Sequence, residues 1–180
     1  MILCNKLIKL LNNEKKWTVL DLWAWTWNYS IFCASYGYKV VALDNESKQE
    51  WLWPEYLKDH PNIQFINWDL RELPEEVTSK KYPIILLFNV VPFLFEKFFQ
   101  KLLLPQIIDM LDDGWVLAMS FFFPDDDMMK NSQLTSYTFE SFENSEIFKI
   151  VNKDDFYFEE THAPMWKHTH HIGYMELMKK

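Results

Sequence analysis

The sequence predicts an α/β fold, in which a doubly wound parallel sheet carries helices on both faces. Two observations support this prediction. Along residues 18–123, apolar strand-like runs alternate with segments of helical period, an order typical of parallel strands joined by right-handed crossovers. The chain has 180 residues, of which 49% are hydrophobic, so it is long and apolar enough for one domain with a full core.

The first elements follow from local sequence pattern. Leu and Ile recur at helical spacing over Ile2–Asn12, which predicts an amphipathic helix. The β-branched and apolar run Thr18–Leu22 predicts a strand buried on both faces. Asn28–Tyr36 is expected to be a helix, and Gly37 suits its C-terminal cap.

The middle of the chain continues the alternation. Pro105 is expected to kink or divide a long helix. A polar connection over Arg71–Lys81 and a turn at Asp112–Gly114 join the regular elements. Strands are expected over Lys39–Leu43, Ile63–Asn67, Tyr82–Phe88 and Val116–Phe123, and helices over Glu46–Lys58 and Phe95–Leu111.

The pattern changes after residue 123. Pro124–Gln133 is expected to be a polar loop, and its run of three Asp residues is expected to be solvated. A helix is expected over Thr138–Phe148. Two strands, Phe156–Thr161 and His170–Met178, are expected to form a hairpin around the turn Ala163–Lys167.

Charge and cysteine content limit the possible partners. The net charge at pH 7 is −8, which argues against a nucleic-acid-binding surface and favours a small-molecule partner. The N-terminal segment is too short and too charged for a signal peptide or a spanning helix, so no membrane partner is expected. Cys4 and Cys33 lack the spacing of a metal or disulfide motif, which indicates a reduced, cytoplasmic protein. No feature of the sequence predicts an oligomeric state.

The glycine and tryptophan content is unusual. The chain has 3 Gly and 9 Trp, and together these approach the roughly one dozen Gly expected at average usage. Arg71 is the only Arg, and the chain is rich in Asn, Ile and Phe, which is typical of an AT-rich gene. We hypothesise that many of these Trp residues are UGA codons that the source reads as Gly. The alternative is genuine Trp in an unusual protein, and UGG codons at positions 23, 25 and 27 would exclude the hypothesis.

The stretch Val19–Ser30 contains the most informative motif. A strand-like run ends in Asp21, and Trp follows at positions 23, 25 and 27, where a tight strand-to-helix turn is expected. With Gly at these positions the line becomes Asp-Leu-Gly-Ala-Gly-Thr-Gly-Asn. It then resembles motif I of the class I S-adenosylmethionine-dependent methyltransferases, whereas dehydrogenase loops follow Gly-x-Gly-x-x-Gly. The resemblance implies a Rossmann-like seven-stranded sheet of order 3-2-1-4-5-7-6, with strand 7 antiparallel.

The same resemblance implies a cofactor site for S-adenosyl-L-methionine. Asp21 would receive the cofactor ammonium, directly or through water. Asp44, with Asn45 beside it, would accept hydrogen bonds from the ribose hydroxyls, or else Asp44 caps the next helix. Asp69 and Leu70 would contact adenine, or Asp69 is a turn acid. The loop and the start of its helix would be formed by Trp23, Ala24, Trp25, Thr26, Trp27 and Asn28.

Residues on the acceptor side are less clearly indicated. Asn89 corresponds to motif IV, which faces methionine and acceptor, although strand-end capping is the alternative. His162 is nominated as a general base. His168 and His170 share one strand face and are assigned to the substrate side, with exposed or satisfied strand residues as the alternative. Metal binding by these histidines is a weaker alternative, but no carboxylate or Cys is spaced to complete a site with them, so no metal is predicted. Phe93 is assigned to the substrate side, although for Phe93 and Phe95 a core position is the favoured interpretation.

The predicted function is methyl transfer from S-adenosylmethionine to a small-molecule acceptor, similar to tellurite-resistance-type methyltransferases. The resemblance covers about residues 15–178 of one domain, 1–180. Residues 1–14 form a lead helix, 15–123 the cofactor-binding half, and 124–180 the substrate-side helix and hairpin. If the Trp residues at 23, 25 and 27 are genuine, an inactive binding module is the alternative, and a nicotinamide-dependent oxidoreductase is a further one.

Overall fold

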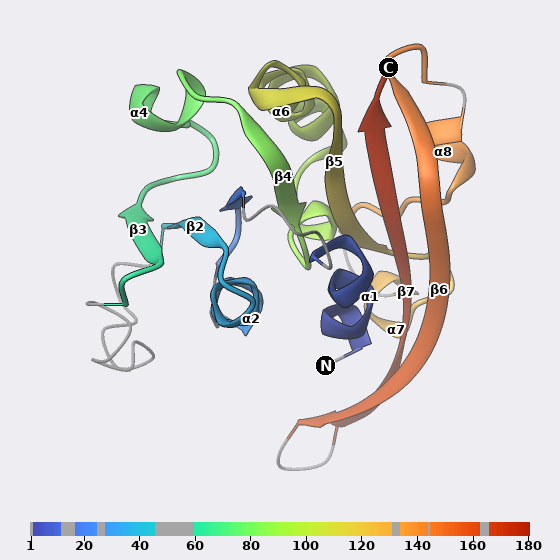
Figure 1. Cartoon of the computed structure of the whole chain (residues 1–180). Helices are drawn as coiled ribbons and strands as arrows, with labels where there is room; N and C mark the ends of the chain where they lie inside the picture. Colours follow the sequence, from blue (N-terminus) through green and yellow to red (C-terminus); the bar gives the residue numbers. More distant parts are fainter. Residues whose placement is uncertain are drawn as a thin grey trace.

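The structure is a computed structural model that describes residues 2–11, 17–24, 28–45, 60–130, 134–143, 145–162 and 166–180. One sheet has the strand order β3-β2-β1-β4-β5-β7-β6 (Figure 1), and β7 pairs antiparallel with both β5 and β6. The predicted fold class and strand order are therefore confirmed. The strands are β1 Thr18–Asp21, β2 Lys39–Asp44, β3 Ile63–Asn67, β4 Tyr82–Leu87, β5 Leu111–Phe122, β6 Phe148–His162 and β7 Trp166–Lys179.

Helices cover both faces of the sheet because the central strands carry apolar side chains on both faces. Val19 packs in one cluster with α1 (Ile2–Leu11) and α2 (Asn28–Ser35). Leu20 points the other way and packs in a second cluster that includes Ile107 of α6 (Leu104–Met110). Successive side chains of a strand point to opposite faces, so each central strand contributes to both layers. This explains why β1, which was predicted to be buried on both faces, is buried at every residue from Val19 to Asp21.

The predicted helix Phe95–Leu111 is divided, as Pro105 indicated. Ahead of it lies the 3-10 turn η1 (Val91–Phe93), and then come α5 (Glu96–Phe98), the π-helical segment η2 (Phe99–Leu103) and α6. Pro105 has no amide hydrogen, and its ring would clash with the carbonyl of Lys101 in a regular helix. The wider π turn lies at that point and accommodates the proline ring.

Several predicted boundaries are wrong. The connection Arg71–Lys81 contains the short helix α4 (Glu75–Thr78), and the loop after Pro124 contains α7 (Asp127–Lys130). β5 begins at Leu111, and the predicted turn Asp112–Gly114 lies where its pairing with β4 shifts register. The expected helix Glu46–Lys58 lies outside the described residues.

The predicted helix Thr138–Phe148 is mostly absent. Only α8 (Glu140–Glu143) is helical, and β6 begins at Phe148. Ser145 Oγ accepts hydrogen bonds from the amides of Ile147 and Phe148 at 3.2 and 3.1 Å. The side chain thus replaces helical carbonyl partners, and it turns the chain into the strand.

The C-terminal hairpin is longer than predicted. β6 and β7 pair from Phe148 opposite Lys179 to His162 opposite Trp166. β5 pairs with β7 only as far as Phe122 opposite Ile172, so the remaining part of the hairpin projects beyond the sheet (Figure 1). Of the predicted turn, residues 163–165 lie outside the described part, and the last two residues belong to β7.

Candidate functional site

The ends of the parallel strands bring the predicted cofactor residues to one edge of the sheet. Asp21 is the last residue of β1, between Ala42 of β2 and Leu86 of β4. Asp44 ends β2 opposite Asn67, the last residue of β3. In open α/β sheets, ligands bind outside the carboxyl ends of the strands. This edge is therefore the candidate site.

Asp21 is a buried carboxyl group with one free acceptor atom. Only 1% of the residue is exposed, and Ser30 Oγ of α2 donates a 2.6 Å hydrogen bond to its Oδ2. Among the described residues, Oδ1 has no hydrogen-bond partner. Burial raises the pKa of Asp21 to about 6, against the opposing effects of the Ser30 hydroxyl and of the Trp23 backbone amide. Buried acceptors without donors are uncommon and costly in proteins, so this atom fits a ligand that brings a donor.

The chain after β1 runs between the ends of its two neighbouring strands. The amide of Leu22 donates to the carbonyl of Leu86 at 3.1 Å, and the amide of Ala24 donates to the carbonyl of Leu43 at 3.1 Å. Ala24 is buried, and Trp23 is partly buried against the α6-side cluster. Residues 25–27 of the predicted loop lie outside the described residues. Asn28 begins α2, as expected.

The backbone at Trp23 does not require glycine. Within the described part of the chain, Asn89 is the only residue other than glycine with a positive φ, at 58°. Trp23 therefore has a conformation open to any L-amino acid. The glycine hypothesis stays a prediction, and it gains no support from the backbone at position 23.

The predicted adenosine residues lie at the ends of β2 and β3. Asp44 is buried, and its carbonyl accepts the amide of Trp68 at 2.9 Å. Asp69 is held by Arg71, whose Nε lies 3.0 Å from Oδ1 and whose Nη2 lies 2.5 Å from Oδ2. Arg71, and to a smaller extent Asn45, hold the pKa of Asp69 below its usual value. Asn45 is exposed. Leu70, which was predicted with Asp69 to contact adenine, belongs to the core. Sequence reasoning missed Arg71 as a partner.

Asn89, two residues beyond β4, is fixed from two sides. Its amide donates to Ser120 Oγ at 2.9 Å, and that hydroxyl donates to Asn89 Oδ1 at 3.2 Å. Asn89 Nδ2 donates to the hydroxyl of Tyr29 at 3.3 Å. Ser120 comes from β5 and Tyr29 from α2, and neither was singled out in the sequence. Asn tolerates a positive φ better than most residues, so Asn89 suits this sharp strand end.

The core interpretation of Phe93 and Phe95 is wrong, because these residues are 50% and 80% exposed. The ring of Phe93 lies edge-on to Phe122, 6.4 Å between centroids. His162 is in β6, opposite Trp166, and its side chain lies outside what the structure describes.

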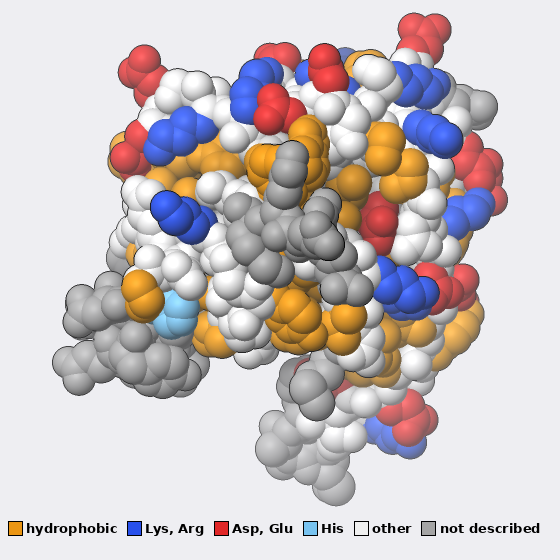
Figure 2. All heavy atoms as spheres, viewed as in Figure 1, with side chains coloured by type: hydrophobic (Ala, Val, Ile, Leu, Met, Phe, Trp, Pro, Cys, Tyr) orange, Lys and Arg blue, Asp and Glu red, His pale blue; other side chains and the backbone are white. Residues whose placement is uncertain are grey.

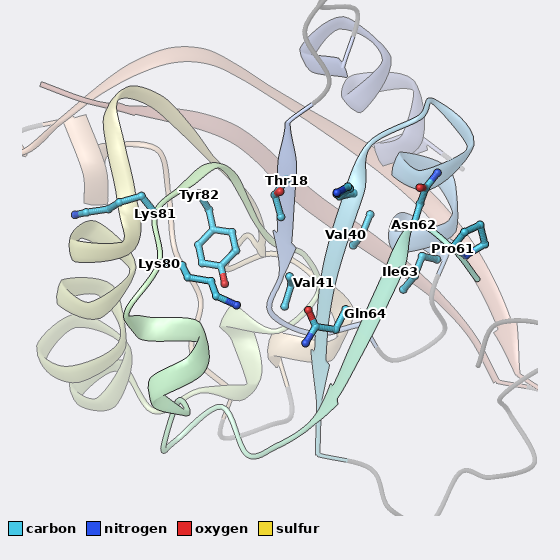
Figure 3. A pocket seen from close by; sticks show the side chains of 11 residues that line it. Thr18, Val40, Val41, Pro61, Asn62, Ile63, Gln64, Lys80, Lys81 and Tyr82 are labelled. Carbon is cyan, nitrogen blue, oxygen red and sulfur yellow. The ribbon is translucent and has the colours of Figure 1, made fainter. Parts of the chain in front are cut away.

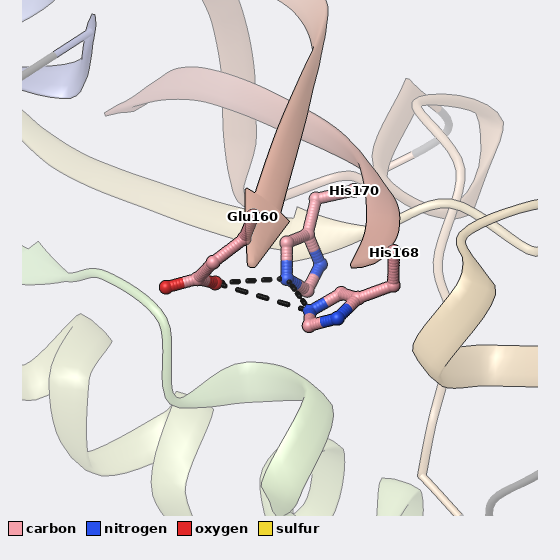
Figure 4. Close-up of side chains that lie close together, drawn as sticks. All are labelled: Glu160, His168 and His170. Carbon is pink, nitrogen blue, oxygen red and sulfur yellow. Dashed lines mark hydrogen bonds and ion pairs between the residues drawn. The ribbon is translucent and has the colours of Figure 1, made fainter. Parts of the chain in front are cut away.

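The histidines of β7 divide between two faces, as predicted. His168 and His170 lie side by side with 2.7 Å between their Nε2 atoms, and Glu160 points toward them from β6 (Figure 4). His171 faces the other way, with Nδ1 2.6 Å from Asp125 Oδ1 and Nε2 3.0 Å from Asp155 Oδ2. The register pairs His168 with Glu160 rather than with His162.

Two predictions about this region are wrong. Asp126 is not solvated but fully buried, and its Oδ2 lies 3.2 Å from His170 Nδ1. A carboxylate that could complete a metal site is present, because one ligand atom from each of Glu160, His168 and His170 lies within 4.8 Å of the others. Glu160 was missed because it belongs to the other strand of the hairpin.

A hollow of about 560 Å³ lies at the opposite edge of the sheet (Figure 3). Thr18, Lys39, Ile63 and Tyr82, which are the first residues of β1 to β4, all line it. Ligands of this fold class bind at the carboxyl ends of the strands, so the hollow is not the candidate site.

The described residues on the face seen in Figure 2 form no continuous basic track. Their Lys and Arg side chains lie scattered among acidic ones, and hydrophobic patches lie between them. Nucleic-acid-binding surfaces gather basic residues on one face, so this face does not suit one. Among the described residues, no helix has the length and apolar character needed to cross a membrane.

Comparison with known proteins gives the fold a name. No protein-family model matches the chain, and a search of the curated proteins finds no relative. Among solved structures, TehB from Haemophilus influenzae matches with a TM-score of 0.74 at 16% identity, over 98% of this chain and 62% of TehB. The chain thus spans less than two thirds of the length of TehB.

Two further solved structures match the fold of this chain. The N-methyltransferase NodS from Bradyrhizobium japonicum WM9, in complex with S-adenosylhomocysteine, matches with a TM-score of 0.74 at 11% identity, over 99% of this chain and 86% of NodS. A 1,6-didemethyltoxoflavin-N1-methyltransferase from Burkholderia thailandensis, with 1,6-didemethyltoxoflavin and S-adenosylhomocysteine bound, matches with a TM-score of 0.68 at 16% identity, over 98% of this chain and 76% of that enzyme. The chain has the Rossmann-like fold of the S-adenosylmethionine-dependent methyltransferases.

Proposed function

We propose that this chain binds S-adenosylmethionine and transfers its methyl group to a small-molecule acceptor. The observation that carries the proposal is the buried Asp21 carboxyl group at the carboxyl end of β1, with an oxygen that lacks a donor among the described residues. An ammonium group is a donor that would satisfy this oxygen and favour the charged carboxylate. NodS, which shares the fold, was solved with S-adenosylhomocysteine.

The other residues of the edge suit the rest of the cofactor. Asp44 is the proposed ribose ligand, because a buried carboxylate at the end of β2 can accept two hydroxyl hydrogens. Asp69 is proposed to meet the adenine amino group, with Arg71 fixing its orientation. Asn89 is proposed to face the methionine part and the acceptor, held there by Ser120.

Little acid–base chemistry is required of the protein. The bound cofactor supplies a methyl group on a sulfonium centre, which is already an activated leaving group. The residues of the chain therefore contribute mainly by aligning the acceptor with that methyl and by excluding water. His162 is our candidate for removing a proton from an acceptor that needs it. The Burkholderia thailandensis enzyme, solved with 1,6-didemethyltoxoflavin, supports a small-molecule acceptor here.

A second function, a binding module without catalysis, is favoured by one observation. Trp23 has an ordinary backbone conformation and packs against the core, as a genuine Trp would. If Trp also occupies positions 25 and 27, three indoles compete for the space that the methionine part needs. Codon identity at positions 23, 25 and 27 separates this alternative from the enzyme.

Calorimetric titration with S-adenosylmethionine tests the role of Asp21. The variant Trp23→Gly/Trp25→Gly/Trp27→Gly, here called the loop-glycine variant, is expected to bind one equivalent. Adding Asp21→Asn is expected to weaken binding by at least about tenfold, because a charge-assisted hydrogen bond of roughly 1.5–3 kcal/mol is lost.

Asp109→Asn in the same background is the matched control, because Asp109 is exposed on α6. Equal affinities for the two added substitutions would contradict the assigned role. Tighter binding of NAD than of S-adenosylmethionine would point to the oxidoreductase alternative instead.

A further inference from the structure

Three side chains at the projecting end of the hairpin point at one another. Glu160 of β6 lies opposite His168 of β7, and His170 follows on the same face. His168 Nε2 is 2.7 Å from His170 Nε2, His170 Nε2 is 3.2 Å from Glu160 Oε2, and His168 Nε2 is 3.9 Å from that oxygen (Figure 4). Among the described residues, this is the only group of His, Cys, Asp and Glu side chains with the spacing of a metal site.

These distances suit a single metal ion. Three donor atoms, each about 2.0–2.1 Å from a zinc ion at tetrahedral angles, stand roughly 3.3 Å from one another. The spacings of 2.7, 3.2 and 3.9 Å lie on both sides of that value. To bind one ion, the two imidazole nitrogens would have to move apart by about 0.6 Å, and Glu160 would have to move about as much closer to His168.

Asp126 prepares His170 for this role. Its Oδ2 lies 3.2 Å from His170 Nδ1 and accepts the amide of His171 at 2.8 Å, and its Oδ1 accepts the amide of Met128 at 2.8 Å. This carboxylate is fully buried and anchored by backbone amides, so it is the natural acceptor for a proton on Nδ1. The lone pair of His170 Nε2 then faces Glu160. Metal-binding histidines are typically oriented by such a carboxylate behind the ring.

Neighbouring aromatic rings fix the His170 ring further. Phe122 stacks on it at 5.2 Å and Phe158 lies at 4.9 Å, measured between ring centroids. With its proton on Nδ1, the ring presents an unprotonated nitrogen 3.2 Å from a carboxylate oxygen. Two acceptors at that distance repel each other unless a proton or a cation lies between them. His168 Nε2, 2.7 Å from His170 Nε2, can donate such a proton, or a metal ion can lie among the three atoms and bind all of them.

We propose that Glu160, His168 and His170 bind a divalent first-row transition metal, with Asp126 as the positioning residue behind His170. Imidazole and carboxylate donors suit Zn²⁺, Fe²⁺ and Co²⁺. The histidine side chains are 10% and 7% exposed, whereas Glu160 is 43% exposed. Three protein ligands leave at least one coordination position for water or another ligand. The proposal does not depend on methyl transfer.

The test uses the full chain, stripped with a chelator and titrated with Co²⁺ in the absence of S-adenosylmethionine. One equivalent is expected to bind and to produce visible d–d absorption, and Zn²⁺ is expected to displace it. Glu160→Gln is expected to weaken Co²⁺ binding by at least about 100-fold, more than Asp126→Asn, for which about 10- to 100-fold is typical of an outer partner.

Glu159→Gln is the matched control. Glu159 neighbours Glu160 on β6 but faces away from the cluster, where it pairs with Lys167 at 2.7 Å on the surface. This variant is expected to bind Co²⁺ like the unsubstituted chain. Absence of one-equivalent binding by the unsubstituted chain would overturn the proposal. Equal Co²⁺ affinity of Glu160→Gln and Glu159→Gln would also overturn it, because the metal would then bind elsewhere.

Discussion

Two residues at the carboxyl edge of the sheet adopt states that are unfavourable in isolation. Asp21 keeps a carboxyl group out of water with one oxygen lacking a donor among the described residues, and Asn89 has a φ of 58°. Each such feature costs on the order of 1–3 kcal/mol. Such costs gather at functional sites, where they pre-organise groups for a ligand. The coincidence of both residues at one edge supports the location of the site.

The raised pKa of Asp21 predicts how the free energy of unfolding depends on pH. Burial raises its pKa from 3.8 to about 6, so between these values the folded state binds more protons than the unfolded state. The free energy of unfolding therefore falls as pH rises from about 4 to 6, and it levels off above that. Relative to Asp21→Asn, the chain is expected to lose on the order of 2–3 kcal/mol between pH 4 and pH 7.5.

Urea unfolding of both chains across this pH range measures the difference. Asp109→Asn, at an exposed site, is the control and is expected to track the unsubstituted chain. A constant difference between Asp21→Asn and the unsubstituted chain from pH 4 to pH 7.5 would refute the elevated pKa.

Regular elements with strong pattern were predictable, and short ones were not. The strand Ile63–Asn67 was predicted at its observed bounds, because its apolar run is bounded by clear turn residues. The helices α4, α7 and α8 have four residues each, too few for a periodic signal. Isolated helices of that length are unstable, and tertiary contacts decide them.

The register of the C-terminal hairpin explains the missed carboxylate. A turn over Ala163–Lys167 would have placed His162 opposite His168. The structure pairs His162 with Trp166 and therefore Glu160 with His168. A shift of two residues keeps every side chain on its face but changes each partner. The local turn signal could not fix the register of the hairpin, whereas the face shared by His168 and His170 followed from alternation alone.

Gly173 makes a prediction about the packing of β7. It lies opposite Phe121 of β5, and a Cβ at this position would stand 2.5 Å from the Phe121 ring. Gly173→Ala is expected to lower the free energy of unfolding by about 1–3 kcal/mol through overpacking. Urea unfolding measures this loss.

The companion variant is Gly173→Ala/Phe121→Leu, in which the smaller side chain makes room for the methyl group. Its loss is expected to be less than the sum of the losses in the two single variants. If the losses in the free energy of unfolding were strictly additive, there would be no steric clash between the two side chains.

At the scale of the whole molecule, alternation of strands and helices predicted the layers but not the order of strands. The order 3-2-1-4-5-7-6 came from the motif resemblance at Asp21 and positions 23–27, and the structure confirms it. Solved structures at 11–16% identity have the same fold, with TM-scores of 0.68–0.74. Chains with mostly different side chains can therefore have this fold, as long as the burial pattern and the crossover handedness agree.

The proposed cofactor loop joins β1 to α2. Its start is tied to β4 and β2 by the amides of Leu22 and Ala24, and α2 starts at Asn28. Glycine at positions 23, 25 and 27 would let the backbone approach a ligand without side chains in the way. Tryptophan adds an indole at each position, which would exclude the methionine part of the cofactor.

The most direct test of this account compares the printed chain with the loop-glycine variant in one calorimetric titration with S-adenosylmethionine. The account predicts that the loop-glycine variant binds one equivalent and that the printed chain does not bind. Equal binding by both chains would show that the indoles do not obstruct the site, and binding by neither would remove the cofactor assignment itself.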